Sequence, residues 1–345
     1  MFQDISIEEL LTLKDQGDIT VIDVRSPSEF MNSTIPGSIN IPFFNDEERE
    51  EIGTIYKQVG VQEAKDRGLE LMSTKLPNFV KEFSNIKGKK AVFCWRGGMR
   101  SRTTATILDL MGIKVFRLEG GYRNYRQWVV HQLENFELDK EVFVLNGNTG
   151  TGKTTILRRL KKEGFPVIDL EGLANHRGSI FGQIGLQPNN QKTFDSFLME
   201  DLQRYQSSPF ILFEGESSRI GKVTLPPFLM KKKEQGLQFV LELPMEERVK
   251  HILEDYEPWN HKQECLEAFK RIKKRLHTPI AKQIELELEA ENFSTAVGLL
   301  LEYYYDPLYE YSTNKYPEDK LINIKADNVD EAITVIKDYL GIRKK

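Results

Sequence analysis

The hydrophobic residues in the first part of the chain form short runs, separated by segments with helical spacing. Three of these runs are short enough to be buried strands and lie at 19–24, 91–94 and 114–118. Residues 6–16 and 102–112 place apolar side chains three and four positions apart, which predicts amphipathic helices, and Gly112 ends the second. Strands that alternate with helices favour a parallel α/β layer.

The same alternation starts again after a charged, weakly patterned stretch at 131–140. Five further apolar runs predict strands at 141–147, 165–170, 210–215, 238–244 and 320–326. Between about 245 and 312 the chain is charged and helical in pattern, which predicts a helical insertion. The sequence thus predicts two α/β domains, residues 1–130 and 141–345, joined by a linker at 131–140.

Composition agrees with a globular protein of two domains. The chain has 345 residues, of which 39% are hydrophobic and 29% charged. No apolar run reaches the roughly 18 residues that a membrane helix needs. The opening MFQDISIEELL is acidic and polar, unlike a secretion signal. We therefore expect a cytoplasmic enzyme with no membrane segment.

Residues 147–154 (GNTGTGKT) match the phosphate-binding pattern G-x-x-x-x-G-K-[ST]. Its glycines let successive backbone amides point inward, where they and a helix N-terminus bind phosphate oxygens. The residues expected to bind a diphosphate are Gly147, Thr149, Gly150, Gly152, Lys153 and Thr154. Thr154 is also placed to hold Mg²⁺ if the ion is present. The loop does not read a base, so ATP or GTP goes beyond the motif; the alternative is a glycine turn with a solvent-exposed lysine.

Two polar segments follow predicted strands of the second domain. Acidic groups at the carboxyl end of a parallel strand lie where α/β proteins bind ligands. The candidates are Asp169, Glu171, His176 and Arg177 after the second strand, and Glu214, Glu216 and Arg219 after the third. They could hold a metal, act as a base or face a ligand. The alternatives are a plain surface loop and a water-facing Glu214.

The chain has two cysteines, Cys94 and Cys265, too few for a disulfide framework. Cys94 directly follows a predicted strand and precedes a helix, so backbone amides at the helix N-terminus favour its thiolate. Arg96 and Arg100 add positive charge, and Gly97 and Gly98 let the loop surround an anion. A buried cysteine without chemistry is the alternative, and it is the interpretation for Cys265.

The residues around this loop resemble a rhodanese domain, whose cysteine carries sulfur as a persulfide. The resemblance rests on VIDVRSPSEF…IPGSINIP (21–42), the Cys94 loop and LEGGYRNYRQW (118–128). Two departures stand out. Five residues, rather than the typical four, separate Cys94 from Arg100, and Thr34 stands where many rhodaneses have histidine. The wider loop fits an anion larger than sulfide and also resembles rhodanese-like phosphatases.

A rhodanese-like domain placed before a P-loop domain, with CWRGGMRS, GNTGTGKT, DLEGLANHRGSIFG and FEGESSRIG in that order, is similar to bacterial tRNA 2-selenouridine synthases over nearly the whole chain. That family replaces the sulfur of 2-thiouridine at the tRNA wobble position with selenium from selenophosphate. Members of the family also attach a geranyl group from geranyl diphosphate to the same sulfur. The resemblance implies that the S-geranyl base is the intermediate in the replacement of sulfur by selenium. The resemblance implies that Cys94 serves selenation and Lys153 serves geranylation.

A tRNA substrate is negatively charged and binds to Lys and Arg side chains. Because the net charge of the chain is −4, these side chains would have to form a local basic surface. Five basic residues lie close together: Lys270, Arg271, Lys273, Lys274 and Arg275. Phe269, Ile272 and Leu276 supply an apolar face, so the basic residues form a ridge. The alternative is a solvated helix face paired with Glu264 and Glu267. Tyr303–Tyr305 and Tyr309 could stack a base, although aromatic packing is the simpler interpretation.

Three other functions fit some of these motifs. An ATP-dependent tRNA sulfurtransferase or kinase would hydrolyse ATP in response to tRNA. A redox- or nucleotide-sensing regulator would have an unreactive Cys94. A phosphatase would use the wide cysteine loop. Oligomeric state and metal dependence cannot be read from these patterns.

Overall fold

The computed structural model describes residues 2–308 and 316–341. The chain divides into two compact units. The first comprises the residues up to Asn135 together with Asp195–Phe197, and the second comprises Phe136–Phe194 and the residues from Leu198 onward. Within the described ranges, no helix is both long and apolar enough to cross a bilayer.

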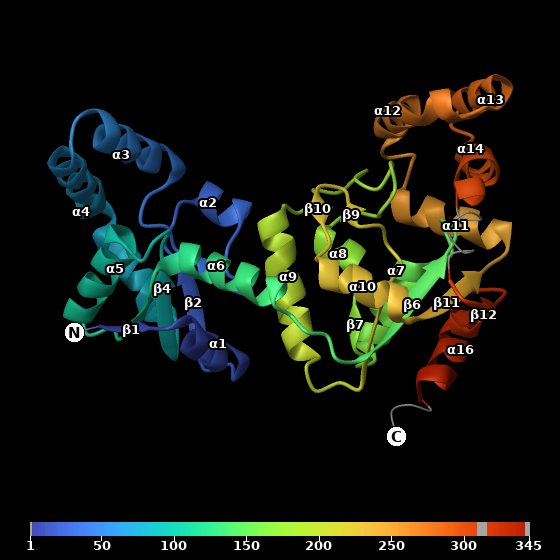
Figure 1. Cartoon of the computed structure of the whole chain (residues 1–345). Helices are drawn as coiled ribbons and strands as arrows, with labels where there is room; N and C mark the ends of the chain where they lie inside the picture. The colour runs from blue at the N-terminus through green and yellow to red at the C-terminus, as the bar shows by residue number, and fades with distance from the viewer. Residues whose placement is uncertain (1, 309–315, 342–345) are drawn as a thin grey trace. The chain divides into compact units, whose positions relative to one another are not determined.

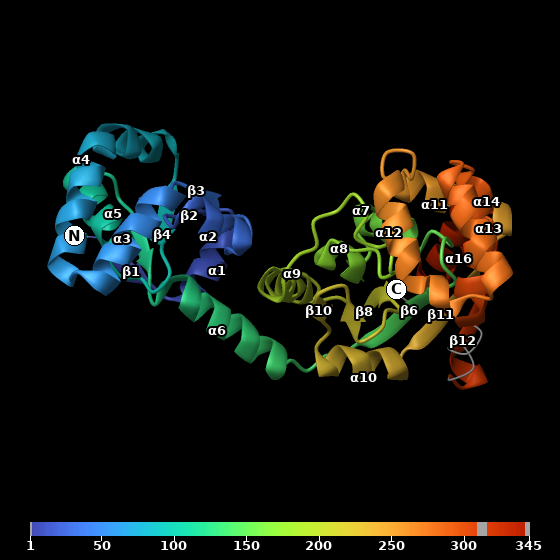
Figure 2. The same ribbon diagram turned by 90° about the horizontal axis from the view of Figure 1, so that it is seen from above.

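The first unit contains a parallel sheet in the order β1-β5-β4-β2-β3. Its strands are β1 (Gln3–Ile5), β2 (Ile19–Asp23), β3 (Ile39–Asn40), β4 (Lys89–Phe93) and β5 (Phe116–Leu118). Its helices are α1 (Ile7–Asp15), α2 (Pro27–Asn32), α3 (Asp46–Gln58), α4 (Val61–Asn85), α5 (Met99–Leu110) and α6 (Gly121–Glu134). Helices α4 and α5 pack together, as do α1 and α6, and Figure 2 shows the two pairs on opposite sides of the sheet. The α/β prediction for this domain is confirmed.

Strands β2 and β4 pair in register, and this pairing positions the cysteine loop. Asp23 lies opposite Phe93, so both strands end at the same level. The amide of Val24 then donates to the carbonyl of Phe93 at 3.0 Å. Because parallel strands point the same way, the segments after them, including Cys94, emerge at one edge of the sheet.

The second unit contains a parallel sheet in the order β12-β11-β6-β8-β7. Its strands are β6 (Glu141–Gly147), β7 (Val167–Ile168), β8 (Phe210–Glu214), β11 (Leu237–Glu242) and β12 (Leu321–Lys325). The predicted strands are therefore present, each within a few residues of its expected bounds. A short antiparallel pair, β9 (Arg219–Ile220) and β10 (Val223–Thr224), was not predicted, because two-residue strands leave no periodic pattern.

Helices complete the second unit (Figure 1). Those around the sheet are α7 (Lys153–Lys162), α8 (Leu170–Ala174), α9 (Gln191–Arg204), α10 (Pro227–Gln235) and α16 (Val329–Gly341). The predicted insertion contains α11 (Met245–Tyr256), α12 (Lys262–Ile272), the 3-10 turn η1 (Lys273–Arg275), α13 (Thr278–Glu289), α14 (Phe293–Leu300) and the π-helical turn η2 (Leu301–Tyr305). The insertion has its own buried core, in which Phe269 of α12 and Ile284 of α13 are fully buried.

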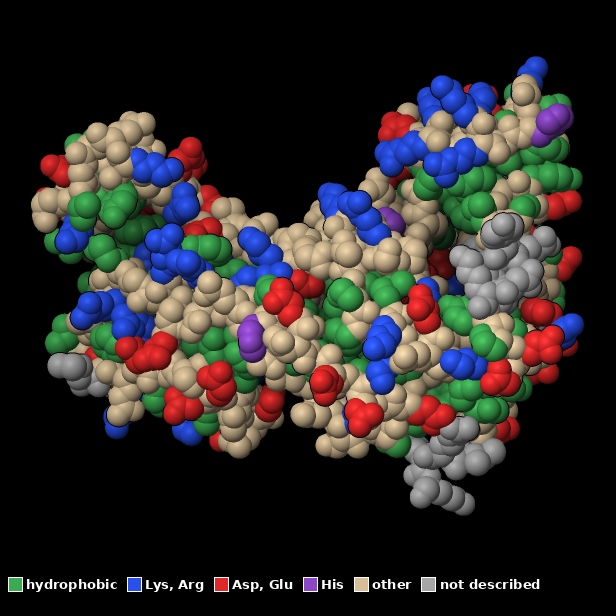
Figure 3. Space-filling view, viewed as in Figure 1, with side chains coloured by type: hydrophobic (Ala, Val, Ile, Leu, Met, Phe, Trp, Pro, Cys, Tyr) green, Lys and Arg blue, Asp and Glu red, His purple; other side chains and the backbone are tan. Residues whose placement is uncertain are grey.

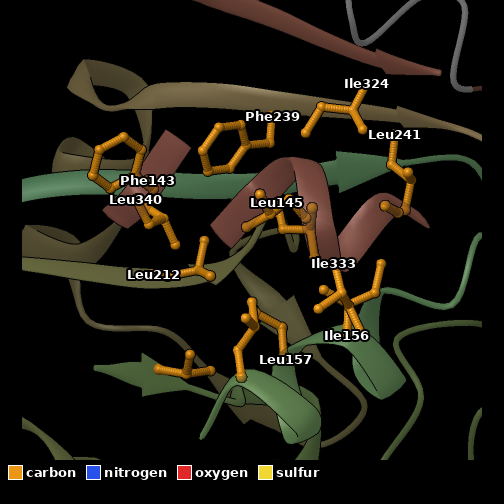
Figure 4. Close-up of a cluster of buried hydrophobic side chains, with 14 of the residues drawn as sticks. Phe143, Leu145, Ile156, Leu157, Leu212, Phe239, Leu241, Ile324, Ile333 and Leu340 are labelled. Atoms are coloured by element: carbon orange, nitrogen blue, oxygen red, sulfur yellow. The ribbon is translucent and has the colours of Figure 1, made fainter. Parts of the chain in front are cut away.

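Apolar side chains from the strands and two helices form the main core of this unit (Figure 4). Phe143 of β6 stacks on Phe239 of β11, with ring centroids 5.4 Å apart and planes 11° apart. Ile156 of α7 and Ile333 of α16 belong to the same cluster. The cluster anchors the end of β6 and the start of α7, between which the phosphate loop lies.

The structure differs from the predicted linker at 131–140. Helix α6 continues through Glu134, so residues 131–134 are helical. Val129 and Leu133, four positions apart, are both buried and extend the apolar stripe of the helix. Leu138 is also buried, and Phe136 packs against Phe228 at 5.2 Å between ring centroids. Because charged and polar residues lie between these few apolar positions, the sequence pattern does not show that the helix continues.

Candidate functional site

The phosphate loop joins β6 to α7 and depends on glycine. Gly150 and Gly152 have φ of +84° and +73°, in the left-handed region that favours glycine. A Cβ atom on Gly150 would lie 2.7 Å from the carbonyl oxygen of Arg248, and one on Gly147 would lie 2.8 Å from that of Leu241. Lys153 Nζ donates to the Gly147 carbonyl at 2.7 Å. The loop therefore has the curled backbone that the motif predicts.

Helix α11 supports this loop through contacts that the sequence did not reveal. The buried Arg248 donates from Nε to the Thr149 carbonyl at 3.0 Å, and its guanidinium forms two bonds with Asp306, at 2.9 and 2.6 Å. Asp306 also accepts from Asn148 Nδ2 at 3.1 Å, and His251 Nδ1 lies 3.0 Å from the Gly150 carbonyl. These partners lie about a hundred or more residues from the loop, so no local pattern marks them.

Three glutamates gather beside the loop. Thr154 Oγ1 donates to Glu171 Oε2 at 2.9 Å, and the amide of Glu171 donates to Glu214 Oε1 at 2.5 Å. Burial, and next the charge of Glu216, raises the pKa of Glu171 to about 8. Burial also raises the pKa of Glu214 and of Glu216. The site therefore binds protons more readily than exposed carboxylates do.

A cavity of about 860 Å³, lined by both polar and apolar groups, opens over the phosphate loop. Of the seven residues predicted after the second and third strands of this domain, Glu171, His176, Arg177 and Glu216 line this cavity. Within the described ranges, no three His, Cys, Asp or Glu side chains converge as a metal site. An ion at Thr154 would therefore depend on oxygen ligands from a bound phosphate as well as from the protein.

The other three of these seven residues, Asp169, Glu214 and Arg219, do not line the cavity. Asp169 caps helix α8, accepting from the Gly172 amide at 2.7 Å, and pairs with Arg158 at 3.1 Å. Arg219 is exposed in the short strand β9. Glu214 is fully buried, and its Oε2 has no hydrogen-bond partner in the described part of the chain.

His176 lines the cavity but is also tightly packed. It is buried, and a Cβ atom on Gly182 or Gly221 would lie 2.8 or 2.6 Å from its ring. Burial, and next the charge of Arg177, lowers the pKa of His176. Its surroundings therefore favour the neutral imidazole, and glycines at positions 182 and 221 leave room for the ring.

The cysteine loop lies between β4 and α5. Cys94 is buried, and its Sγ lies 3.2 Å from Ser101 Oγ. The carbonyls of Cys94 and Trp95 accept from the amides of Tyr122 and Arg123, both at 2.9 Å. Gly121 has φ of +61°, and a Cβ atom there would lie 2.3 Å from the Cys94 carbonyl oxygen. The N-terminus of α6 thus fixes the loop through close backbone contact.

The two arginines of the cysteine loop differ in their surroundings. Arg100 donates to the Glu29 carboxylate at 2.5 and 3.2 Å, whereas Arg96 is exposed. Arg117, which was not predicted, donates to the Gly97 carbonyl at 3.0 Å. Arg100 and Arg117 both lie close enough to Cys94 to interact with its charge. Each of these arginines also pairs with a carboxylate, Arg100 with Glu29 and Arg117 with Asp4.

Thr34 belongs to a buried polar network under the sheet edge. Its hydroxyl donates to Asp23 Oδ2 at 2.9 Å, and Arg25 Nη2 donates to the same oxygen at 2.5 Å and to the Ser33 carbonyl at 2.6 Å. The Arg25 guanidinium lies over the Tyr122 ring, 4.3 Å from its centroid. The threonine that stands where many rhodaneses have histidine therefore helps to hold the Asp23 carboxylate in place.

The basic segment spans the end of α12 and the turn η1. Its apolar face is confirmed, since Phe269, Ile272 and Leu276 are buried. Figure 3 shows Lys and Arg side chains gathered over α12. Of the basic residues, Lys270, Arg271, Lys274 and Arg275 are exposed. Lys273 pairs with Glu285 at 2.5 Å. Arg275 lines the cavity over the phosphate loop, where it donates to the Tyr304 hydroxyl at 3.3 Å.

Glu264 and Glu267 have other partners than this basic segment. Glu264 bonds to His261 at 2.8 Å, and Glu267 accepts from Gln263 at 3.1 Å. Among the tyrosines, Tyr304 is buried in the insertion core and packs edge-on against Tyr305 at 5.0 Å, whereas Tyr303 is exposed. Tyr309 lies outside the described residues.

A rhodanese-like domain that carries a cysteine loop and a P-loop domain with a helical insertion are therefore joined in one chain. Residues 6–127 match the rhodanese-like domain family, and residues 140–338 match the family described as the tRNA 2-selenouridine synthase AAA domain. The chain belongs to the tRNA 2-selenouridine synthase family.

Relatives match the chain almost from end to end. The tRNA 2-selenouridine synthase of Sulfurovum sp. is 31% identical over 92% of this chain and 94% of the relative. That of Hydrogenovibrio crunogenus is 35% identical over 89% of this chain and 92% of the relative. Among solved structures, a rhodanese-related protein from Thermoplasma volcanium is similar to 37% of this chain and 93% of its own, with 22% identity and a TM-score of 0.24.

Proposed function

We propose that the protein replaces the sulfur of 2-thiouridine in tRNA with selenium, through an S-geranylated base. The observation that carries this proposal is the presence of the Cys94 loop and the Lys153 loop in one chain that is aligned over most of its length with relatives named tRNA 2-selenouridine synthase. The proposed substrates are tRNA carrying 2-thiouridine at the wobble position, geranyl diphosphate and selenophosphate.

In the first step, the sulfur of 2-thiouridine attacks C1 of geranyl diphosphate. A carbon–sulfur bond forms, the bond from C1 to the diphosphate oxygen breaks, and the N3 proton of the base passes to solvent. The leaving diphosphate gains negative charge, which inward-facing amides and a nearby ammonium group stabilise. The curled loop at 147–154 and Lys153 support this role.

Glu171 and Thr154 would help to hold the diphosphate through Mg²⁺. Phosphate oxygens, the Thr154 hydroxyl and an ionised Glu171 are the oxygen ligands that this ion prefers. Binding of the cation would favour the charged form of Glu171, whose pKa burial raises to about 8. This arrangement does not require ATP.

In the second step, selenium from selenophosphate takes the place of the alkylated sulfur. Selenium bonds to C2 of the base, the bond from C2 to sulfur breaks, geranylthiol leaves with a proton, and water takes up the phosphoryl group. Alkylation makes the sulfur a better leaving group. The Cys94 thiol, near Arg100 and Arg117, would bind selenophosphate and orient its selenium, and no selenium–sulfur bond to Cys94 is needed.

Nucleoside mass spectrometry tests this function. Wild-type protein incubated with thiolated tRNA, geranyl diphosphate and selenophosphate, without ATP, should form 2-selenouridine. Cys94→Ala should accumulate the S-geranyl base without selenation, whereas Lys153→Ala should leave 2-thiouridine unchanged. If the wild-type protein forms neither modified base, or forms 2-selenouridine only with ATP, the proposal is wrong. Selenation by Cys94→Ala would exclude the role of that thiol.

A further inference from the structure

The Cys94 loop presents several backbone amides that have no partner. Among the described residues, the amides of Arg96, Gly97 and Gly98 donate to no acceptor. The first three amides of α5, those of residues 99–101, have none within the helix, as at any helix N-terminus. Gly97 has φ of +63°, so the backbone turns between these amides. A run of unpaired amides at a turn before a helix is suited to bind the oxygens of a tetrahedral anion.

Side chains add a nucleophile and positive charge to these amides. Cys94 is buried at the start of the loop, whereas Arg96, two residues further on, is exposed to solvent. The Glu29 carboxylate holds the Arg100 guanidinium through two bonds, at 2.5 and 3.2 Å. Ser101 Oγ lies 3.2 Å from Cys94 Sγ. A thiolate next to groups that bind an oxyanion is placed to attack the central atom of that anion.

The chemistry of selenophosphate indicates which of its atoms a thiolate attacks. Selenophosphate holds selenium at the oxidation level of selenide. A sulfur–selenium bond would therefore need an oxidant, or would leave the phosphorus reduced to phosphite. Attack on phosphorus needs neither, because selenium leaves with the electron pair of its bond. Selenide is also a much weaker base than an alkoxide, so it can leave without a proton donor.

The geometry points to Cys94 as the acceptor of the phosphoryl group of selenophosphate. This inference rests on the proposed function and names the bond that the thiolate forms. A sulfur–phosphorus bond forms, the phosphorus–selenium bond breaks, and selenide leaves to attack C2 of the S-geranyl base. Water then attacks phosphorus, the sulfur–phosphorus bond breaks, and inorganic phosphate leaves with the protons of the water. The Ser101 hydroxyl, beside Sγ, stabilises the thiolate as it departs.

Two radioactive forms of selenophosphate test this bond. Wild-type protein is mixed with selenophosphate and S-geranyl tRNA and then denatured with detergent. The protein should retain label from radioactive phosphorus, at Cys94, and none from radioactive selenium. Cys94→Ala should retain neither label. The matched control is Cys265→Ala, which changes the other buried cysteine and should behave like wild type.

Substitution of Ser101 separates the two halves of this step. Ser101→Ala removes the hydroxyl that stabilises the departing thiolate, so the phosphorylated cysteine should accumulate about threefold while the formation of 2-selenouridine slows. A merely structural effect on the loop would instead lower both quantities. Ser84→Ala, the same change on an exposed position of α4, should alter neither.

The two readouts separate failure of this inference from failure of the proposed function. If wild-type protein forms 2-selenouridine but retains selenium at Cys94, the thiolate does not accept the phosphoryl group. The same conclusion follows if neither wild type nor Ser101→Ala retains phosphorus while 2-selenouridine forms. If wild-type protein forms no 2-selenouridine from S-geranyl tRNA, the proposed function is wrong, and phosphorus at Cys94 would then show phosphoryl transfer alone.

Discussion

At the scale of single residues, burial determines how the carboxylates near the phosphate loop behave. Glu171 lies among Thr154, Glu214 and Glu216, and burial raises its pKa to about 8. An unfolded chain would release this proton near pH 4.5, the ordinary value for the side chain. The folded state therefore binds the proton more tightly than the unfolded state does.

The stability of the unliganded protein should consequently depend on pH through Glu171. Because the folded pKa is the higher one, the favourable contribution is complete below about pH 4.5 and is lost as the pH rises toward 8. Glu171→Gln removes this dependence. Differential scanning fluorimetry should show the variant gaining several degrees of melting temperature over wild type between pH 5 and pH 8.

A matched control for this prediction is Glu50→Gln, which changes an exposed carboxylate of α3 in the same way. Its melting temperature should follow that of wild type at every pH. The explanation from burial fails if Glu171→Gln and wild type differ by the same amount at pH 5 and at pH 8.

At the scale of elements, the insertion has two distinct faces. Phe269, Ile272 and Leu276 pack into its core, whereas Lys270 and Lys274 are exposed at the end of α12 and in η1. Their lysine ammonium groups are free to approach the phosphates of a nucleic acid. Lys273 differs, because it pairs with Glu285.

Reversing these two charges should weaken tRNA binding. For Lys270→Glu combined with Lys274→Glu, we expect the dissociation constant to rise about tenfold and the salt dependence of binding to fall by roughly two phosphate contacts. Filter binding at several salt concentrations measures both. Lys65→Glu with Lys81→Glu, on exposed positions of α4, makes the same charge change elsewhere and should have a smaller effect. Equal effects of the two pairs would indicate that only net charge matters.

At the scale of the whole molecule, the loops proposed for geranylation and for selenation lie in different compact units. The Cys94 loop and the sheet that positions it lie in the first unit, and the Lys153 loop lies in the second with a separate core. Each loop is held by contacts within its own unit: Gly121 and Tyr122 for the first, and Arg248 and His251 for the second. A substitution in one loop should therefore leave the other intact.

Two inactive variants should then complement each other. A mixture of Cys94→Ala and Lys153→Ala, supplied with both substrates and thiolated tRNA, should form 2-selenouridine more slowly than wild type, because the S-geranyl tRNA can pass between molecules. Time-resolved nucleoside analysis measures the recovery, and each variant alone is the control. If Lys153→Ala selenates purified S-geranyl tRNA but the mixture stays inactive, the intermediate does not leave the protein that makes it.

Much of the fold could be predicted from the sequence, because the relevant signals are local. Strands β6, β8 and β11 are buried on both faces and therefore read as continuous apolar runs. The phosphate loop and the Cys94 loop were recognisable because their glycines, charged residues and nucleophile are adjacent in sequence. The shorter elements β1, β3 and α2 carry too few residues for a period to show.

Tertiary structure decided which side chains surround those loops. The pairing of Arg100 with Glu29, the support of Thr149 by Arg248, and the cavity over the phosphate loop all join segments that are distant in sequence. Such contacts depend on how helices pack on the sheets, and hydrophobic periodicity reports only that a face is buried. The sequence by itself therefore determined the two α/β domains and their reactive loops, and packing determined the electrostatic surroundings and the space available to a ligand.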